Sequence, residues 1–442
     1  MAATPAIYRT AARLASGLAP ALSLLSPKLA AGHRGRHGSP DRLSAWAARQ
    51  RDPARPLVWF HASSVGEGLQ AESVLLQLRT LCPAAQYAYT HFSPSAEALA
   101  RRLPVDIADY LPYDLPGPVE ALLRSLRPDL LVFSKLDLWP ELAVRAAARG
   151  AAVAIVAATV SPGSGRLRWA ARALLRVGYE AVSAAAAVSD EDAARLARLG
   201  VSPGRIRVLG DPRYDSVVDR IAGMGVDDPL LAFGRGAPTL VAGSTWPEDE
   251  AVVLAAFAGV LASHPSARVI LVPHEPTEAH LVGAERAALR LGLPVPVRLS
   301  RAEAPTPVLL VDRLGVLARL YGAGTMAYVG GGFGRAGLHS VLEPAAWGVP
   351  VAFGPRWSES RDAAALLAAG AARALRIDRG AAVEELGGIW RGWIERDGER
   401  RTAGETGRAL VERGRGASAR SAELLAGLIS SPRPRTSPSV GR

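Results

Sequence analysis

The sequence predicts an α/β protein with two doubly wound domains, each built on a parallel sheet. Short apolar segments alternate with helical patterns along most of the chain, as is typical of parallel strands joined by helices. The chain has 442 residues, which is long for a single core and suits two domains. The alternation also runs in two series, and residues 215–237 between them read as a linker.

The first series follows the N-terminal region and predicts one parallel sheet. The expected strands are residues 57–60, 85–90, 130–133, 152–157, 181–188 and 206–209. Each is a short apolar run, which suits a strand covered on both faces. Helical patterns follow several of them, at residues 69–78, 95–103 and 136–148.

The second series predicts a second sheet, with strands at residues 239–242, 269–272, 308–311, 326–329 and 351–353. We therefore expect four regions, namely an N-terminal anchor and basic lead-in (1–50), a first domain (51–215), a second domain with terminal helices (216–430) and a disordered tail rich in Pro, Ser and Arg (431–442). Two Rossmann-like domains facing one another would form a cleft, which is a common place for a ligand.

Composition and charge narrow the functional classes. Hydrophobic residues make up 49% and charged residues 21%, as in ordinary globular proteins. The net charge is +11, but almost all basic residues are arginines, which together with abundant Ala, Gly and Pro reflects genome composition. Basic residues do not alternate with aromatic ones, so we expect no nucleic-acid partner. The charge suits anionic lipid or a phosphorylated substrate.

Cysteine and histidine usage predicts an intracellular protein without a metal or other cofactor. Cys82 is the only cysteine, so no disulfide can form within the chain. The eight histidines show no spacing typical of metal ligands.

The N-terminal region is basic and modestly apolar. Residues 1–56 carry nine Lys or Arg against two Asp, a net charge of +7. Leucines recur through residues 14–25, but Pro20 and Pro27 interrupt the run, which is too short for a confident membrane span. A helix lying on an anionic membrane surface fits this composition, and a solvated basic lead-in is the alternative.

The loop after the first strand carries the strongest candidate for catalysis. It reads His-Ala-Ser-Ser-Val-Gly-Glu-Gly over residues 61–68 and joins a strand to a helix. In open α/β sheets ligands bind beyond the carboxyl ends of the strands, so Glu67 lies where chemistry is expected. The alternative is that Glu67 only caps its helix, because acidic residues favour the first turn.

The second domain has a glycine-rich loop that predicts a phosphate site. Strand 326–329 leads into residues 330–340, which contain Gly330 to Gly332, Gly334 and Gly337, and then into a helix. Glycines at a strand end before a helix present free N–H groups to an anion. The loop matches neither the dinucleotide fingerprint nor a Walker motif. Glu343 could accept hydrogen bonds from ribose hydroxyls or act as an acid at the helix dipole.

Two further strand ends carry polar residues in this domain. Gly243-Ser244-Thr245 could contact a nucleotide or sugar, and Pro273-His274-Glu275 follows the next strand. A lone histidine such as His274 is more often structural than catalytic. Spacing alone supports neither a Ser/His/Asp triad nor a carboxylate pair.

Taken together, these motifs resemble the 3-deoxy-D-manno-octulosonic acid (Kdo) transferases, bacterial enzymes of lipopolysaccharide synthesis with the two-domain GT-B fold. The resemblance covers about residues 55–370. It rests on residues 61–69, Tyr-Leu-Pro-Tyr-Asp-Leu-Pro at 110–116, Leu-Trp-Pro at 138–140, Ala-Gly-Ser-Thr at 242–245, Val-Asp at 311–312 and the glycine-rich region 330–355.

The resemblance implies transfer of Kdo from CMP-Kdo to a lipid A precursor, with inversion and without a metal. It implies Glu67 as the general base and the second domain as the site of the CMP-sugar. It also implies attachment to the cytoplasmic face of the inner membrane. The expected substrate-binding residues are Ser64, Gly66, Lys135, Asp137, Gly243, Ser244, Thr245, Pro273, His274, Gly331, Gly332, Gly337, His339, Ser340 and Glu343.

The chain departs from the family pattern at three places. Lys135-Leu136-Asp137 stands where Glu-Thr-Glu is usual, His274-Glu275 where an Arg-His pair is common, and Ser340 where Asn is usual. We interpret Lys135 as a contact for an anionic group of the acceptor, with an internal ion pair to Asp137 or Glu141 as the alternative. Two other functions stay open, namely a sugar-nucleotide epimerase of similar architecture and a degenerate, non-catalytic homologue.

Overall fold

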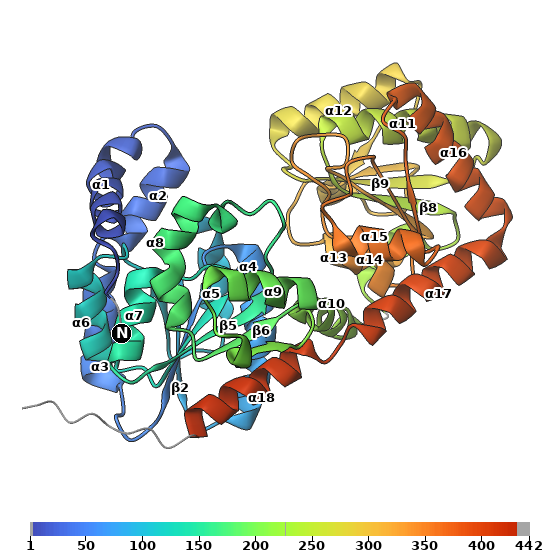
Figure 1. Cartoon of the computed structure of the whole chain (residues 1–442). Coiled ribbons are helices and arrows are strands. Elements are labelled where there is room, and N and C mark those ends of the chain that lie inside the picture. Colours follow the sequence, from blue (N-terminus) through green and yellow to red (C-terminus); the bar gives the residue numbers. More distant parts are fainter. Residues whose placement is uncertain (1–2, 226, 431–442) are drawn as a thin grey trace, which may run out of the picture. The chain divides into compact units, whose positions relative to one another are not determined.

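The structure, a computed structural model, describes residues 3–225 and 227–430 and divides the chain into two compact units (Figure 1). Unit 1 comprises Met1–Ser216 with Arg415–Arg442, and unit 2 comprises Val217–Gly414. Each unit has one seven-stranded sheet in which every strand pair is parallel. The prediction of two parallel α/β sheets is therefore confirmed.

The sheet of unit 1 has the strand order β3-β2-β1-β4-β5-β6-β7. Its strands are β1 (Leu57–His61), β2 (Gln86–His91), β3 (Ile107–Tyr110), β4 (Leu130–Ser134), β5 (Ala152–Ala158), β6 (Ala184–Ala187) and β7 (Ile206–Val208). Its helices are α1 (Ala6–Leu22), α2 (Pro27–Arg36), α3 (Ser39–Gln50), α4 (Val65–Leu81), α5 (Glu97–Arg102), α6 (Pro116–Leu126), α7 (Pro140–Ala148), α8 (Trp169–Glu180), α9 (Asp190–Leu199) and α18 (Ala417–Ser430).

Alternate residues of each central strand enter two different cores. In β1, Leu57 and Trp59 pack into the cluster on one face, and Val58 and Phe60 pack into the cluster on the other. All four side chains are buried, which is why the strand reads as a continuous apolar run.

The sheet of unit 2 has the strand order β10-β11-β9-β8-β12-β13-β14. Its strands are β8 (Thr239–Thr245), β9 (Arg268–Pro273), β10 (Val297–Arg298), β11 (Val308–Leu310), β12 (Met326–Val329), β13 (Val351–Phe353) and β14 (Ala372–Ala374). Its helices are α11 (Pro247–Ser263), α12 (Glu278–Arg290), α13 (Leu317–Leu320), α14 (Leu342–Ala346), α15 (Arg361–Ala368), α16 (Arg379–Glu395) and α17 (Asp397–Arg413). Helix α10 (Pro212–Ala222) contains the boundary between the units, so the expected linker is partly helical.

The strand orders define a topological switch point in each unit. The chain leaves β1 toward β2 on one side, and β4 lies on the other side of β1. In unit 2 the corresponding neighbours are β8 and β12. Ligands of open α/β sheets bind at such points, beyond the carboxyl ends of the strands. The loops after β1, β4, β8 and β12 are therefore the first places to look for a site.

The expected assignment of the last helix to the second domain is wrong. Helix α18 belongs to unit 1, where Ala422 and Leu425 are fully buried in the core cluster that also contains residues of α4. The Asp215 carboxylate fixes the start of α18 by accepting hydrogen bonds from the backbone N–H groups of Gly416 (2.6 Å) and Ser418 (2.8 Å). The expected disordered tail, residues 431–442, lies outside the described residues.

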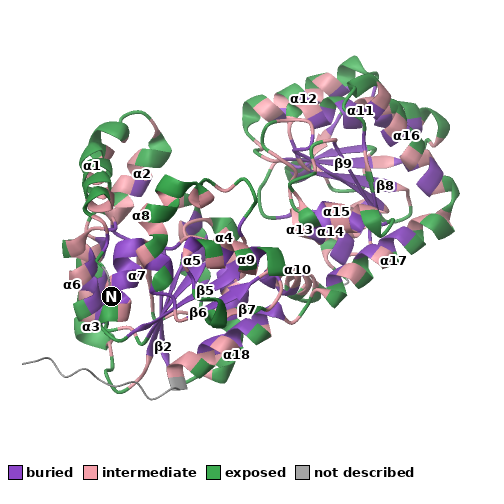
Figure 2. Cartoon of the chain, in the orientation of Figure 1, coloured by how far each residue is buried: buried purple, intermediate pink, exposed green. Residues whose placement is uncertain are grey.

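The N-terminal region is more integrated into unit 1 than the expected anchor and lead-in. Leu43 and Trp46 of α3 are buried in the core of unit 1. Helix α1, in contrast, has no buried residue (Figure 2). Among residues 3–225 and 227–430, no helix has both the length and the apolar character needed to cross a membrane.

Candidate active site

Glu67 lies in the first turn of α4, directly after β1, at the switch point of unit 1. Ser64 is the N-cap residue, and the two side chains form a capping box. The Glu67 carboxylate accepts hydrogen bonds through Oε2 from the backbone N–H (3.2 Å) and the hydroxyl (3.0 Å) of Ser64. The capping interpretation is thus satisfied by one oxygen, and Oε1 has no hydrogen-bond partner in the described part of the chain. Gly66 is exposed and has open space around its Cα.

The end of β4 lies against the same turn. Ser134 donates a hydrogen bond from its hydroxyl to the backbone carbonyl of Glu67 (2.9 Å). The next residue, Lys135, has a φ of +60°, a left-handed conformation that costs a non-glycine residue free energy. Within residues 3–225 and 227–430, its ammonium group has no hydrogen-bond or ion-pair partner. The alternative of an internal pair with Asp137 or Glu141 therefore finds no support.

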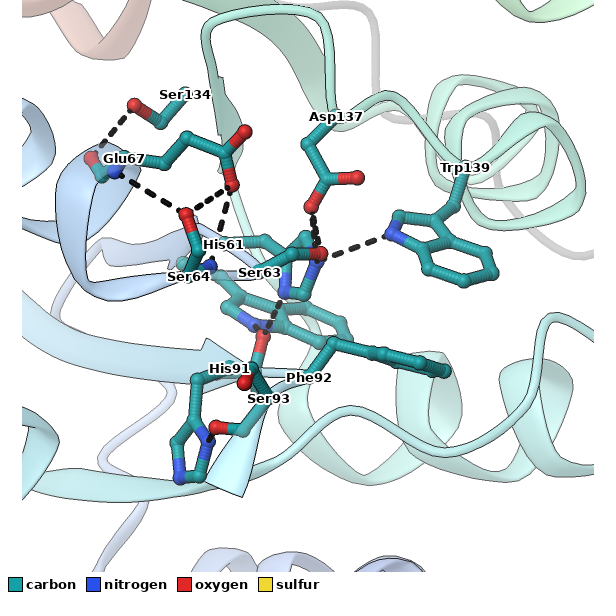
Figure 3. Close-up of polar contacts among 12 residues, drawn as sticks. His61, Ser63, Ser64, Glu67, His91, Phe92, Ser93, Ser134, Asp137 and Trp139 are labelled. Carbon is teal, nitrogen blue, oxygen red and sulfur yellow. Dashed lines mark hydrogen bonds and ion pairs between the residues drawn. The ribbon is translucent and has the colours of Figure 1, made fainter. Parts of the chain in front are cut away.

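Asp137 is held by two residues of the β1 end (Figure 3). Its Oδ2 atom lies 3.0 Å from His61 Nε2 and accepts a short hydrogen bond from the Ser63 hydroxyl. Burial opposes ionisation of Asp137, but the neighbouring His61 and the hydrogen bond from Ser63 outweigh it and keep the pKa of the carboxyl below its usual value. The Oδ1 atom has no partner among the described residues, so it is free to accept a further bond.

His61 is fully buried and connects β1, β2 and the loop after β4. Its Nδ1 atom lies 3.0 Å from the Thr90 hydroxyl, and Trp139 donates its indole N–H to Nε2 (3.0 Å) (Figure 3). Ser63, His61 and Asp137 do not form a catalytic triad, because the serine bonds directly to the aspartate and no base is left for its proton. The network fixes positions; it does not activate a nucleophile.

In unit 2, the end of β8 carries Ser244 and Thr245. Ser244 has a φ of +53°, and its side chain is partly exposed. Thr245 is fully buried and donates its hydroxyl to Glu250 (2.9 Å), which also pairs with His280 (2.9 Å). Burial raises the pKa of Glu250, although His280 and Thr245 oppose the shift. The hydroxyl proton of Thr245 is thus engaged inside the protein, and its role as a substrate contact stays a prediction.

Three of the predicted glycines are required by packing. A Cβ atom at Gly331 would lie 2.0 Å from the Gly337 carbonyl oxygen, one at Gly332 would lie 2.7 Å from Gly354 Cα, and one at Gly243 would lie 2.2 Å from the Tyr321 hydroxyl. The backbone N–H of Gly331 donates to the buried Asp249 carboxylate (2.9 Å). The N–H of Gly331 is therefore engaged inside the protein, and the role of Gly331 in substrate binding stays a prediction.

The rest of the glycine-rich loop has backbone N–H groups that are available to a ligand. The backbone N–H groups of residues 332–338 have no hydrogen-bond partner in the described part of the chain. Gly337 has a φ of +82° and open space around it. Helix α14 begins only at Leu342 and has five residues, so it adds little to an anion site. The loop, not the helix end, is the candidate contact for a phosphate.

His339 and His274 form an aromatic group beside this loop, at the ends of β12 and β9. Their rings stack with centroids 4.3 Å apart, and Trp246 lies 5.0 Å from His274. Trp246 donates its indole N–H to His339 Nε2 (3.3 Å). Burial and the neighbouring His274 lower the pKa of His339 to about 4, so its imidazole is neutral at neutral pH. The proton then resides on Nδ1, which has no other partner among the described residues and can donate to a ligand.

The other predicted residues of unit 2 have different surroundings. Glu343, in α14, accepts a hydrogen bond through Oε1 from Arg220 of α10 (2.7 Å). Burial raises the pKa of Glu343, and Arg220 partly opposes this. Pro273 is the buried last residue of β9, and Ser340 is exposed. Glu343 thus lies in the first turn of α14, as the helix-dipole interpretation expects, and also pairs with Arg220. Its Oε2 atom has no partner among the described residues, and binding of ribose hydroxyls stays a prediction.

Sequence reasoning missed the acidic pair that supports the unit 2 site. Asp249 is fully buried and accepts hydrogen bonds from Gly331, from the backbone N–H of Trp246 (3.0 Å) and from the Tyr328 hydroxyl (2.8 Å). Asp249 and Glu250 follow Pro247 in the first turn of α11. A proline followed by acidic residues signals a helix start, but not that both carboxylates face inward.

The fold alone places this protein in a structural class. The structure resembles UDP-GlcNAc 2-epimerase from Neisseria meningitidis bound to UDP-GlcNAc, with a TM-score of 0.60 at 12% identity, over 85% of this chain and 99% of that chain. At this identity the likeness shows the fold alone, which is the two-domain α/β architecture of GT-B enzymes.

Sequence comparison identifies the family. The family model described as 3-deoxy-D-manno-octulosonic-acid transferase (kdotransferase) matches residues 37–216. The 3-deoxy-D-manno-octulosonic acid transferase of Bordetella pertussis is 31% identical over 385 residues, which are 83% of this chain and 87% of that protein. The transferase of the same description from Haemophilus influenzae is 27% identical over 305 residues, 67% of this chain and 70% of that protein. The chain belongs to the Kdo transferase family of glycosyltransferases.

Proposed function

We propose that this protein transfers Kdo from CMP-Kdo to a lipid A precursor in lipopolysaccharide synthesis, with Glu67 as the general base. Family membership supports the reaction. The observation that carries the role of Glu67 is its fixed carboxylate at the switch point of unit 1, with one oxygen held by Ser64 and the other free. A base must lie within hydrogen-bond reach of the proton that it removes, and a side chain already fixed loses little freedom on binding.

The chemistry is a single displacement with inversion. The acceptor hydroxyl gives its proton to Glu67 while its oxygen attacks the anomeric carbon of Kdo. The bond from that carbon to the phosphate oxygen of CMP breaks, and CMP leaves with the electron pair. One glycosidic bond forms, one sugar–phosphate bond breaks, and the proton resides on Glu67.

Unit 1 offers the contacts that a phosphorylated sugar acceptor needs. Oε1 of Glu67 and Oδ1 of Asp137 can accept bonds from sugar hydroxyls, and Ser64 and Gly66 border the same turn. Lys135, whose ammonium is unpaired within the described residues, suits a phosphate group. A lysine in place of the family's usual acidic residue thus keeps a role in binding the acceptor.

Unit 2 offers donors for the CMP-sugar. The N–H groups of residues 332–338, including Gly332 and Gly337, and Nδ1–H of His339 can bind the phosphate and stabilise the charge that develops as CMP leaves. Hydroxyl groups of Ser244 and Ser340 and the free oxygen of Glu343 can bind sugar or ribose hydroxyls. His274 stacks on His339 and so keeps its orientation.

We further propose that α1 lies on the cytoplasmic surface of the inner membrane. Leu14, Leu18 and Leu22 recur at intervals of four residues, so they share one helix face, and their exposed fractions are 61%, 56% and 44%. Leu24 and Leu25 follow and are more exposed still, at 88% and 77%. An exposed apolar face beside a basic segment is typical of helices bound to anionic membrane surfaces.

The test is direct. Purified protein is incubated with CMP-Kdo and a lipid A precursor, and the products are identified by mass spectrometry. We expect a lipid product heavier by one or more Kdo units together with free CMP, and a rate within twofold of normal after treatment with EDTA, because we propose no metal or other cofactor. Hydrolysis of CMP-Kdo without a lipid product would contradict the transferase proposal.

A sugar-nucleotide epimerase is the second candidate, because the fold neighbour is one. It would change the sugar of a UDP-sugar in the absence of any lipid acceptor. A non-catalytic homologue would bind CMP and form no product. A parallel incubation with UDP-GlcNAc alone tests the epimerase. Binding of CMP without a product in either incubation would indicate the non-catalytic homologue.

A further inference from the structure

Helices α1 and α2 contact the loops of the unit 1 site through a small set of polar and aromatic residues. Arg9 of α1 donates to both carboxylate oxygens of Glu141, from Nε to Oε2 (2.8 Å) and from Nη2 to Oε1 (3.1 Å). Glu141 is fully buried in the first turn of α7 and lies two residues after Trp139. A planar guanidinium bonded to both oxygens fixes orientation as well as distance.

The adjacent residue of α1 strengthens this attachment. Tyr8 donates its hydroxyl to Asp114 Oδ2 (2.7 Å). The Asp114 carboxylate also accepts bonds from the backbone N–H groups of Glu141 and Leu142 (2.9 Å each), so it caps α7. Burial raises the pKa of Asp114 to about 6, which leaves the carboxyl ionised at neutral pH and able to accept all three bonds. Helix α1 is thus linked to the start of α7 directly through Arg9 and indirectly through Tyr8 and Asp114.

Helix α2 contacts the same region by another route. Arg36 donates from Nη1 to the backbone carbonyl of Phe92 (2.8 Å), and its guanidinium lies 3.8 Å from the centre of the Phe92 ring. The Phe92 ring, in turn, lies 5.0 Å from that of Trp139. Phe92 follows β2 at the carboxyl edge of the sheet.

Both routes end at Trp139. Its indole N–H donates to His61 Nε2 (3.0 Å), and Asp137 Oδ2 lies 3.0 Å from the same ring atom (Figure 3). Trp139 precedes α7, so a shift at the start of α7 moves Trp139 directly. A shift of Phe92 removes the ring that packs against it. The position of Asp137, with its free oxygen, therefore depends on contacts made from outside the site.

We propose that Arg9 and Arg36 are positioning residues of the acceptor site, which fix the 137–142 segment through Glu141 and Phe92. On this proposal α1 and α2 form part of the site's framework in addition to any contact with a membrane. The proposal rests on the proposed function only for its kinetic test.

Two arginines of the same helices provide matched controls. Arg13 of α1 and Arg34 of α2 are exposed, and neither has a hydrogen-bond or ion-pair partner among residues 3–225 and 227–430. Arg13→Ala and Arg34→Ala remove the same charge as Arg9→Ala and Arg36→Ala, but leave the contacts to α7 and Phe92 intact. Any effect of charge on membrane binding is therefore common to both pairs.

The first measurement is amide hydrogen exchange of the full chain without substrates. We expect exchange of peptides that cover residues 137–143 to be at least threefold faster in Arg9→Ala and in Arg36→Ala than in wild type, and unchanged in the two controls. Equal exchange in all five proteins would overturn the proposal, even if a variant melts early.

The second measurement is kinetic and uses a deacylated, water-soluble acceptor, so that membrane binding plays no part. We expect the apparent KM for the acceptor to rise three- to tenfold in Arg9→Ala and Arg36→Ala, with the KM for CMP-Kdo within twofold of wild type. In an Asp137→Asn background the same changes should have less than half of that effect. Full effects in both backgrounds, or equal losses for both substrates, would show a merely structural role and contradict the proposal.

Different results would contradict the proposed function and the positioning role. If wild-type protein transfers no Kdo, the proposed function is wrong and the exchange result still decides the positioning role. If wild type is active and Arg9→Ala and Arg36→Ala behave like the controls in both measurements, the positioning role is wrong.

Discussion

Glu67 shows how one side chain can serve a helix and a reaction at once. Glutamine also suits the third position of a capping box, so Glu67→Gln keeps the cap and removes the base. We expect it to lose about a hundredfold to ten-thousandfold in kcat, with an unchanged melting temperature and nearly unchanged affinity for CMP. Glu67→Ala should lose a similar factor in rate and about 1 kcal/mol of stability as well.

Rate assays with thermal melts of both variants separate the two roles of Glu67. A Gln variant within a factor of three of the wild-type rate would remove Glu67 from the mechanism.

Lys135 is the second residue whose role can be measured. Lys135→Ala should raise the apparent KM for the acceptor, or lower kcat, because the unpaired ammonium is proposed to bind a phosphate. The effect should shrink with an acceptor that lacks this phosphate. Steady-state kinetics with the two acceptors provide the measurement, and Lys135→Gly is a useful companion because glycine also relieves the backbone strain at a φ of +60°.

A structural lysine would behave differently. In that case Lys135→Ala would melt early and treat both acceptors alike, and the proposed contact would be wrong.

The lowered pKa of His339 predicts how low pH affects the stability of unit 2. Its pKa is lowered to about 4 in the folded state, whereas an unfolded chain has a histidine pKa near 6.5. Between these values the unfolded chain binds the extra proton, so the contribution of His339 to stability is complete above about pH 6.5 and is lost as the pH falls toward 4. We expect His339→Gln to reduce the fall in unfolding free energy over this range, as measured by urea denaturation at several pH values. An unchanged slope would contradict the assignment.

At the residue scale, a sequence indicates local pairs better than distant ones. Ser64 and Glu67 form a recognisable Ser-x-x-Glu capping pattern, so their partnership is visible in the chain itself. The contacts of His61 come from β2 and from the loop after β4, up to 78 residues away. The Gly331 contact with Asp249 spans 82 residues. No local pattern reports such pairs.

At the scale of elements, strands buried on both faces were predicted well and short or polar ones were missed. The long apolar runs of β4 and β5 clearly indicate strands. In contrast, β3 reads Ile-Ala-Asp-Tyr and β10 has only two residues, so neither shows an apolar run. Helix α18 has a recognisable apolar face, but periodicity does not say which sheet that face covers.

Helix α1 yields a prediction that leaves its contacts with α7 intact. Replacing the exposed Leu14 and Leu18 by serine should weaken binding to vesicles that contain anionic lipid, because the proposed membrane face loses its apolar groups. High salt should weaken binding further by screening the basic segment. Vesicle cosedimentation measures both effects, and activity on a deacylated acceptor serves as the control. Unchanged binding of the double variant would show that the contact lies elsewhere.

At the scale of the whole molecule, the strand orders explain why the site residues could be found from sequence. The predicted residues follow β1 and β4 in one unit and β8, β9 and β12 in the other, so they meet at the switch points. The rule that ligands bind beyond the carboxyl ends of strands requires only the positions of those ends, and apolar runs in the sequence predict these positions. It does not require the contacts that decide whether each residue is free, and for this reason the internal hydrogen bonds of Thr245 and Gly331 could not be predicted.

The return of the chain to unit 1 has a practical consequence for protein engineering. Unit 2 is an uninterrupted insertion within unit 1, and the insertion points are close because Asp215 bonds to the backbone of Gly416 at 2.6 Å. Joining residue 216 to residue 415 by a short Gly-Ser linker should therefore give a compact, cooperatively folding single-domain protein, measurable by circular dichroism and chemical denaturation. A fragment that simply stops at residue 414 should be poorly soluble, since it leaves the cavity filled by Ala422 and Leu425 open to water. During translation, likewise, unit 1 begins to emerge from the ribosome before unit 2 but is completed after it.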